Sequence, residues 1–257
     1  MSMKIKVFTF NLRTNAAVDG INMFPNRKGR ILDTIRTYAP ELIGFQEAND
    51  EMREWLRAEL SDYVVVGCGR NADYRGESVV LAYKKDAFEA LWTECFWLSA
   101  TPSVPGSTFG LDQSSCPRIT TVACLKHRSA ATPFVFCNTH LDHKGKTARL
   151  LGAVQLMQYL SEKPYKFVLT GDFNALPDTP EIQAITSLPG LDVIDATCEL
   201  GGTFHAFGKY DNDRKSKIDY IFTNMPCDIS DSFIIPDEGI EGIYISDHHP
   251  VCTEIEI

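Results

Sequence analysis

The residues of this chain that could do chemistry are polar side chains that interrupt apolar, strand-like runs or directly follow them. The last interruption, Ser246-Asp247-His248-His249, places a carboxylate beside an imidazole. The others have the same form and are Asn11, Gln46-Glu47, Asn138-Thr139-His140, Gly171-Asp172-Phe173-Asn174 and Asp219. Because a polar group is costly to bury without a partner, repeated interruption of core strands predicts a functional site.

The acidic and amide side chains of this set favour a hard divalent cation. Carboxylate and amide oxygens are the ligands that Mg²⁺ and Mn²⁺ prefer. The set supplies five such side chains, namely Asn11, Glu47, Asp172, Asn174 and Asp247. The competing interpretation is that each residue is a cap or a turn former at the end of a strand. That interpretation is weaker for all five together, because unpaired carboxylates are costly to bury.

Two histidines at strand ends, His140 and His248, suit proton transfer. A carboxylate bound to an imidazole holds one tautomer and raises its basicity, and acids elsewhere in the chain could orient each ring. We expect His127 and His205 to be structural. His249 should be structural or act only through a neighbour, because adjacent residues of a strand face opposite sides.

Motifs of other enzyme classes do not occur in the sequence. Neither segment 171–174 nor segment 12–20 resembles a glycine-rich phosphate-binding loop. No Ser or Cys stands in a nucleophile-elbow context, so we expect no covalent acyl-enzyme. The eight cysteines include no C-x-x-C pair and several lie inside apolar runs, so neither a zinc cage nor a disulfide framework is expected.

Composition limits the size of the fold and the partners of the chain. The 257 residues are 44% hydrophobic and carry a net charge of −9, which allows a large core, and we expect a single domain over residues 1–257. The acidity argues against a broad basic face for nucleic acid, although a bound cation could supply positive charge to a phosphoester. A strand at the very N-terminus and no run of membrane-spanning length predict a soluble, cytoplasmic protein with no membrane partner.

Alternating apolar patterns predict an α/β fold. Helical spacing predicts helices at 27–38, 51–60, 147–160 and 180–187. Strands are expected at 4–12, 42–46, 63–67, 78–83, 87–97, 119–126, 134–140, 166–170, 192–195, 218–223, 229–235 and 251–257. Both halves contain a helix and a strand that ends in a polar pair, which indicates two packed sheets that meet at a shared edge.

Taken together, the motifs resemble those of the endonuclease/exonuclease/phosphatase family, the metal-dependent phosphoesterases built like pancreatic DNase. The six motifs stand in the family's order: Thr9-Phe10-Asn11-Leu12, Gly44-Phe45-Gln46-Glu47, Asn138-Thr139-His140-Leu141, Thr170-Gly171-Asp172-Phe173-Asn174, Lys217-Ile218-Asp219-Tyr220-Ile221-Phe222 and Ser246-Asp247-His248-His249-Pro250. The resemblance implies a mixed α/β four-layer sandwich, in which helices flank two packed mixed β-sheets. It also implies hydrolysis of phosphoesters with Mg²⁺ or Mn²⁺.

The resemblance assigns roles to the metal ligands and to the catalytic base. Glu47 is the expected principal metal ligand, with Asn11 and Asp247 close to the ion. Asp219 is the acid expected to orient His248, and this Asp-His pair would activate or position the attacking water.

The resemblance also assigns the contacts to the phosphate. Asp172 and Asn174 match family residues that contact the scissile phosphate and, in some members, a second metal. His140 matches the imidazole on the far side of the phosphate, which stabilises charge or assists the leaving group. Glu77 is expected to orient His140.

One loop indicates a branch of the family. The segment from Phe96 to Arg118 looks like the loop of the nocturnin and deadenylase branch and of its bacterial relatives. Arg118 is therefore the candidate cationic contact to phosphate, since guanidinium binds phosphate in a bidentate manner. The alternative is a solvated arginine at the start of a strand.

The substrate is left open by the sequence. Lys217-Ile218-Asp219 stands where inositol phosphatases carry Cys-Asp-Arg. We expect a compact phosphoester, such as a nucleotide or a short nucleic acid, and no obligate protein partner. The alternatives are a nuclease for RNA or single-stranded DNA and a catalytically inactive binding scaffold of the same fold. Phe204 and Phe207 could stack on a base, but aromatic residues at this spacing are more typical of a core.

Overall fold

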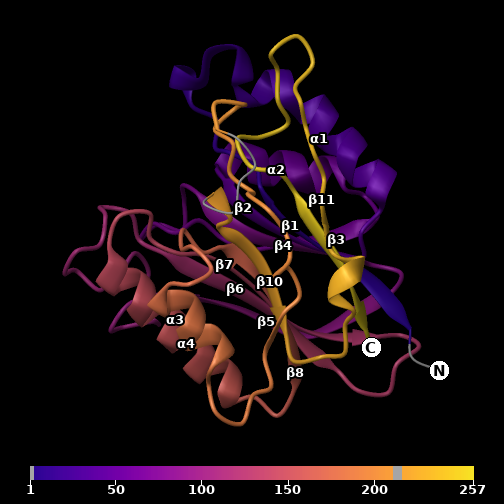
Figure 1. The fold of residues 1–257 in the computed structure, drawn as a ribbon, viewed down its shortest axis with the longest axis vertical. Helices are drawn as coiled ribbons and strands as arrows, with labels where there is room; N and C mark the ends of the chain where they lie inside the picture. Colours follow the sequence, from indigo (N-terminus) through magenta and orange to yellow (C-terminus); the bar gives the residue numbers. More distant parts are fainter. Residues whose placement is uncertain (1–2, 211–215) are drawn as a thin grey trace.

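Two six-stranded mixed sheets form the centre of the computed structural model, which describes residues 3–210 and 216–257 (Figure 1). The first sheet runs in the order β11 (Phe233–Ile234), β12 (Val251–Glu256), β1 (Lys4–Asn11), β2 (Leu42–Ala48), β4 (Ser78–Lys84), β3 (Tyr63–Val66). The second runs in the order β5 (Phe88–Trp97), β6 (Ile119–His127), β7 (Phe134–His140), β8 (Lys166–Asp172), β10 (Asp219–Thr223), β9 (Ile194–Asp195).

Helices cover the outer face of each sheet. Among the described residues, α1 (Phe24–Tyr38) and α2 (Asp50–Glu59) pack on the first sheet, while α3 (Lys146–Ser161) and α4 (Pro180–Thr186) pack on the second (Figure 1). A third apolar cluster lies between the sheets and joins residues such as Val7, Leu81, Phe136 and Ile221. The predicted four-layer α/β sandwich is thus confirmed. No helix in the described part of the chain is long and apolar enough to cross a bilayer.

The two sheets repeat one strand pattern, which explains the duplication visible in the sequence. In each sheet a parallel pair, β1–β2 or β7–β8, has an antiparallel neighbour on both sides. The carboxyl ends of a parallel pair lie at the same edge, so their terminal polar residues become neighbours. In the second sheet, His140 stands opposite Asp172, which in turn stands opposite Asp219.

Two of the polar interruptions join the sheets. Gln46 donates from its Nε2 to Asn138 Oδ1 at 2.7 Å, and Asn138 donates from its Nδ2 to the carbonyl of Phe45 at 2.8 Å. All three residues are fully buried. A Cβ at Gly44 would lie only 2.7 Å from Asn138 Oδ1, so the glycine is needed for this close approach. Gln46 and Asn138 therefore serve as buried cross-links beneath the site.

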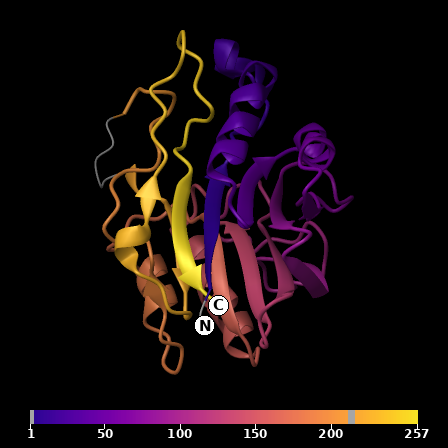
Figure 2. The same cartoon turned by 90° about the vertical axis from the view of Figure 1, so that its right-hand side faces the viewer.

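The ends of the chain are neighbours in the first sheet. Met3 and Ile257 exchange backbone hydrogen bonds of 3.2 and 2.9 Å, and the two termini lie together in Figure 2.

Most predicted elements are present, with shifts of a few residues at their ends. The strand predicted at 229–235 is wrong over its first half, where Ile229–Asp231 forms a 3-10 turn before the short β11. The side chain of Asp228 accepts the N–H of Ser230 and caps this turn, which competes with strand pairing. Helix α1 begins three residues before the prediction, because Pro25 suits a first helical turn. A 3-10 helix at Ala17–Asn22 was not predicted.

Candidate active site

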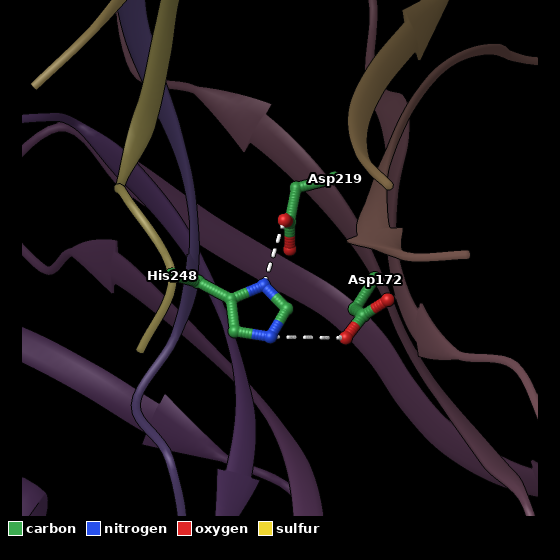
Figure 3. A group of neighbouring side chains, drawn as sticks. All are labelled: Asp172, Asp219 and His248. Atoms are coloured by element: carbon green, nitrogen blue, oxygen red, sulfur yellow. Dashed lines mark hydrogen bonds and ion pairs between the residues drawn. The ribbon is translucent and has the colours of Figure 1, made fainter. Parts of the chain in front are cut away.

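A buried carboxylate–imidazole pair stands at the centre of the site. Asp219 begins β10, and its Oδ2 lies 2.8 Å from Nδ1 of His248 (Figure 3). The same carboxylate oxygen accepts the hydroxyl of Thr203 at 2.6 Å. Because a carboxylate only accepts, Nδ1 carries the proton and Nε2 is left to face the cleft. The pairing expected between these residues, which are 29 positions apart, is present.

Negative charge around His248 controls its protonation. Burial lowers the pKa of the imidazole, but the charge and hydrogen bond of Asp219, with the charges of Asp172 and Asp247, raise it to about 10. A cation bound among these carboxylates would oppose their effect and favour the neutral imidazole.

Asp172 lies between the two imidazoles of the site. Its Oδ2 is 3.8 Å from Nε2 of His248 (Figure 3). The same oxygen is 3.4 Å from Nε2 of His140. The carboxylate accepts the side-chain amide of Asn11 at 3.0 Å and the backbone N–H of Asn174 at 2.9 Å. Burial and the charge of the nearby Asp219 raise its pKa to about 7.

Asn174 and His140 hold each other in place. The Asn174 amide donates to the carbonyl of Leu141 at 3.1 Å and lies 3.1 Å from Nε2 of His140. With the amide nitrogen as donor, His140 accepts at Nε2 and is neutral. Burial, together with the positive charges of Arg118 and Arg70, holds the pKa of His140 well below its ordinary value.

Three residues of the site have left-handed backbone, which costs free energy for a residue with a side chain. Arg13, Glu47 and Asn174 have φ values of 53°, 62° and 47°. At Glu47 the unusual conformation coincides with a register shift in the pairing of β2 with β4, after Phe45. Such backbone persists where the surrounding structure enforces it, and it turns these side chains towards the site.

Glu47 and Asp247 form the acidic side of the site. Glu47 accepts the N–H of Thr14 at 3.0 Å and the side-chain amide of Asn11 at 3.2 Å. The Arg13 guanidinium donates two hydrogen bonds of 2.9 Å to Asp19 and lies 4.0 Å from Glu47 and 3.8 Å from Asp247. Burial raises the pKa of Asp247, the charge of nearby Glu47 adds to the effect, and His248 only partly opposes it.

These two acids have the chemistry of a hard-cation site. Their oxygens are the preferred ligands of Mg²⁺ and Mn²⁺, and both carboxylates line the same cleft. Asn11 presents its nitrogen to Glu47, while its oxygen accepts the N–H of Arg13 at 2.9 Å. In this arrangement the side-chain amide of Asn11 holds the Glu47 carboxylate in position. For the Asn11 oxygen to bind a metal ion, the amide would have to rotate.

A second group of possible ligands, Asp172, Asp219 and His248, has atoms within 4.8 Å of one another. We favour the hydrogen-bonded pair over a metal site there. The 2.8 Å distance from Nδ1 to Asp219 has the geometry of a hydrogen bond, and Thr203 occupies the same oxygen.

Thr203 fixes the position of Asp219, so its hydroxyl offers a test of the pair. The hydroxyl donates to Asp219 and accepts the backbone N–H groups of Ile218 and Asp219, each at 3.1 Å. We expect Thr203→Val to lower kcat roughly tenfold, the worth of a hydrogen bond to a charged group. Thr203→Ser keeps the hydroxyl and should stay close to the parent. Equal losses in two folded variants would contradict this role.

Glu77 lines the same cleft as His140 but pairs with another residue. It forms an ion pair of 2.7 Å with Arg70, and no hydrogen bond joins it to His140 within the described ranges. The prediction that Glu77 orients His140 is therefore not met in this structure, where Asn174 contacts that ring. The reason is the nearby guanidinium of Arg70, which sequence reasoning did not consider.

Arg118 is buried and is not the solvated arginine of the alternative interpretation. It is 4% exposed, lies 3.4 Å from Asp142 and contacts Nδ1 of His143 at 2.8 Å. Its side chain lines the same cleft as His140. It can contact a bound anion from this wall.

Of the site residues predicted from the sequence, all except Asn11 and Asp219 line one cleft of about 390 Å³. Sequence reasoning missed Arg13, Arg70 and His143 as lining residues. It also favoured a core position for Phe204, whose ring instead packs 4.9 Å from that of His248 and lines the cleft. His205 and His249 each follow one residue of the isolated bridge between Phe204 and His248; their rings stack 4.1 Å apart and line a different cavity.

Comparison with known proteins agrees with the fold and the motifs. The model of the Endonuclease/Exonuclease/phosphatase family matches residues 8–248. An endonuclease/exonuclease/phosphatase from Bacteroides vulgatus is 30% identical, with a TM-score of 0.87 and coverage of 99% of both chains. No functionally curated protein matches the sequence.

Two other solved structures have names that state an activity or indicate a branch of the family. A mannosyl-6-phosphatase from Bacteroides thetaiotaomicron is 27% identical, with a TM-score of 0.82 over 98% of this chain and 99% of the other. The catalytic domain of human nocturnin is 18% identical, with a TM-score of 0.73 over 98% and 92%, and shows likeness of fold alone. With the family model spanning nearly its whole length, the chain belongs to the endonuclease/exonuclease/phosphatase family of phosphoesterases.

Proposed function

We propose that this chain is a divalent-metal-dependent hydrolase of phosphoester bonds, acting as one domain on compact substrates. The observation that supports this most directly is the buried Asp219–His248 hydrogen bond of 2.8 Å. The imidazole of that pair opens onto the same cleft as Asp172, Asn174 and His140. Acids and imidazoles at this density are costly to bury, so their convergence favours a catalytic role over a structural one.

The acidic side of the cleft would hold the metal. Glu47 and Asp247 are the proposed ligands of Mg²⁺ or Mn²⁺, and Asn11 positions Glu47. When bound, the cation polarises a phosphate oxygen and offsets charge on the leaving group.

The residues around Asp172 would accept the proton of the attacking water and bind the phosphate. Asp219 keeps the proton on Nδ1 of His248, so that Nε2 can accept a proton from a water placed in line with the phosphorus. An entering phosphate oxygen would replace His140 Nε2 as the acceptor of a hydrogen bond from the side-chain amide of Asn174. Asp172 holds the backbone N–H of Asn174 and so fixes the turn that presents the amide.

The cleft favours a small substrate. Its volume of about 390 Å³ suits one sugar or nucleoside with a phosphate, and Phe204 offers a ring on which a sugar or base can pack. Similarity to the mannosyl-6-phosphatase, at 27% identity, supports a sugar phosphate. The net charge of −9 disfavours tracking along a nucleic acid.

A screen of phosphoesters with added metal tests this proposal. Sugar phosphates, inositol phosphates, nucleotides, short oligonucleotides and bis-(nitrophenyl) phosphate are incubated with the protein and Mg²⁺ or Mn²⁺. We expect turnover of at least one small monoester or diester, with no turnover in Glu47→Ala. No hydrolysis of any compound would leave the binding scaffold as the better account. Preferred hydrolysis of oligonucleotides, with affinity that falls steeply with salt, would favour the nuclease.

Removal of metal should abolish turnover and leave the fold in place. We expect dialysis against a chelator to reduce hydrolysis to background, because the acidic side then lacks its counter-charge. Readdition of Mg²⁺ or Mn²⁺ should restore it. Circular dichroism checks that the chelated protein stays folded, and undiminished turnover after exhaustive chelation would contradict the metal requirement.

A further inference from the structure

Two half-buried cysteines from different sheets meet beside the cleft. Cys95 lies on β5 at the edge of the second sheet, and Cys68 follows β3 of the first. Each thiol is among the groups that shift the pKa of the other, and the backbone N–H of Cys68 also acts on the pKa of Cys95. Both pack against a small apolar cluster, made of Val79, Trp97 and Ile119.

Backbone geometry independently places these residues together. Thr121 stands opposite Cys95 in the β5–β6 pairing, and its hydroxyl lies 3.4 Å from the Cys95 sulfur. A Cβ built on Gly67 would lie 3.5 Å from that hydroxyl, an ordinary contact distance, so Gly67 is a neighbour of Thr121. Cys68 is the next residue in the chain, so its backbone lies near the cross-strand partner of Cys95.

The segment that follows Cys68 forms a wall of the cleft. Arg70 and Glu77, at its two ends, both line the cleft and pair with each other at 2.7 Å. Its link to the second sheet includes the indole N–H of Trp97, which donates to the carbonyl of Arg70 at 2.6 Å. A covalent link at Cys68 would add to this contact and fix the wall to β5.

The microenvironment makes Cys95 the more reactive thiol of the two. The hydrogen bond from Cys68 lowers the pKa of Cys95 to about 7, against the opposing effect of burial, and Thr121 adds to the lowering. The same contact raises the pKa of Cys68. Cys198 and Cys227 are similarly half-buried, but burial raises the pKa of each. Thiolate character at near-neutral pH is the property of cysteines that undergo exchange.

We propose that Cys68 and Cys95 form a reversible disulfide that ties the Arg70–Glu77 wall of the cleft to the second sheet. The oxidant is a small-molecule disulfide such as oxidised glutathione. The Cys95 thiolate attacks it, forms a mixed disulfide and releases one thiolate. Cys68 then loses its proton to solvent and attacks the Cys95 sulfur, releasing the second. Two protein thiols and one disulfide thus become one protein disulfide and two small thiols.

Peptide mapping after oxidation tests the bond itself. The folded protein is incubated with oxidised glutathione, alkylated, digested and analysed by mass spectrometry with and without reductant. We expect one peptide containing Cys68 joined to one containing Cys95, in the parent and in Cys198→Ser, and its loss after reduction. Cys68→Ser should instead keep a glutathione adduct on Cys95. Oxidation that leaves Cys68 and Cys95 as free thiols, or pairs either with another cysteine, would overturn the proposal.

Hydrogen exchange tests the tether. In the oxidised parent, backbone amides of residues 69–77 should exchange more slowly than in the reduced protein, while Cys68→Ser should show no change on oxidation. Equal exchange in the oxidised and reduced parent would mean that the bond does not restrain the wall.

Discussion

His248→Ala should lower kcat for phosphoester hydrolysis by at least about a hundredfold, which is the usual worth of a positioned acid–base group. The imidazole is buried, bonded to Asp219 at 2.8 Å and directed by that bond towards the cleft. Its loss removes the proton acceptor and also leaves the Asp219 carboxylate with only Thr203 as a partner on Oδ2. Steady-state kinetics at saturating metal and substrate gives the comparison.

The neighbouring histidine supplies a matched control. His249 stacks its ring on that of His205, and both rings line a cavity other than the cleft. We expect His249→Ala to keep kcat within about threefold of the parent, because it alters neither the proton acceptor nor its acid. Near-native turnover in His248→Ala, or equal losses in both variants, would rule out the proposed role of His248.

Glu47→Gln should reduce kcat/KM by about a thousandfold or more at sub-saturating metal. The substitution preserves size but removes one of two acids expected to hold the cation, and Lewis-acid stabilisation is worth several kcal/mol. The concentration of Mg²⁺ or Mn²⁺ needed for half-maximal activity should rise as well. Titration of activity with metal separates the weaker metal binding from the lower maximal rate.

An acid on the adjacent helix controls for the change in charge. Glu51 is exposed on α2 and contacts Asn15 at 3.4 Å. Glu51→Gln removes the same charge away from the cleft, so its metal dependence should match that of the parent. If Glu47→Gln and Glu51→Gln behaved alike, Glu47 would not be a metal ligand.

The sequence predicted those parts of the fold that depend on local patterns. Apolar periodicity located the four helices and most strands, because burial of one face constrains residue types at regular spacing. It overestimated the strand at 229–235, where the cap from Asp228 to Ser230 decides the local structure. A cap made by one side chain involves too few residues to change the apolar periodicity from which strands are predicted.

The motifs identified most of the side chains that meet in the cleft, but not all of their partners. Asp219 and His248 could be paired in advance because family resemblance links their motifs. Glu77 shows the limit, because its ion pair with Arg70 depends on how the segment between them folds. Arg13 was passed over although it follows the first motif directly, since only its left-handed backbone turns it towards Glu47 and Asp247.

The most direct test of the central claim is the rate of phosphoester hydrolysis by the purified chain as a function of added Mg²⁺ or Mn²⁺. A small sugar phosphate and bis-(nitrophenyl) phosphate serve as substrates, after exhaustive chelation of the protein. We predict background rates without metal and a saturable rise with metal in the parent, and almost none in His248→Ala. A rate that is independent of metal, or one that persists in His248→Ala, would contradict the account.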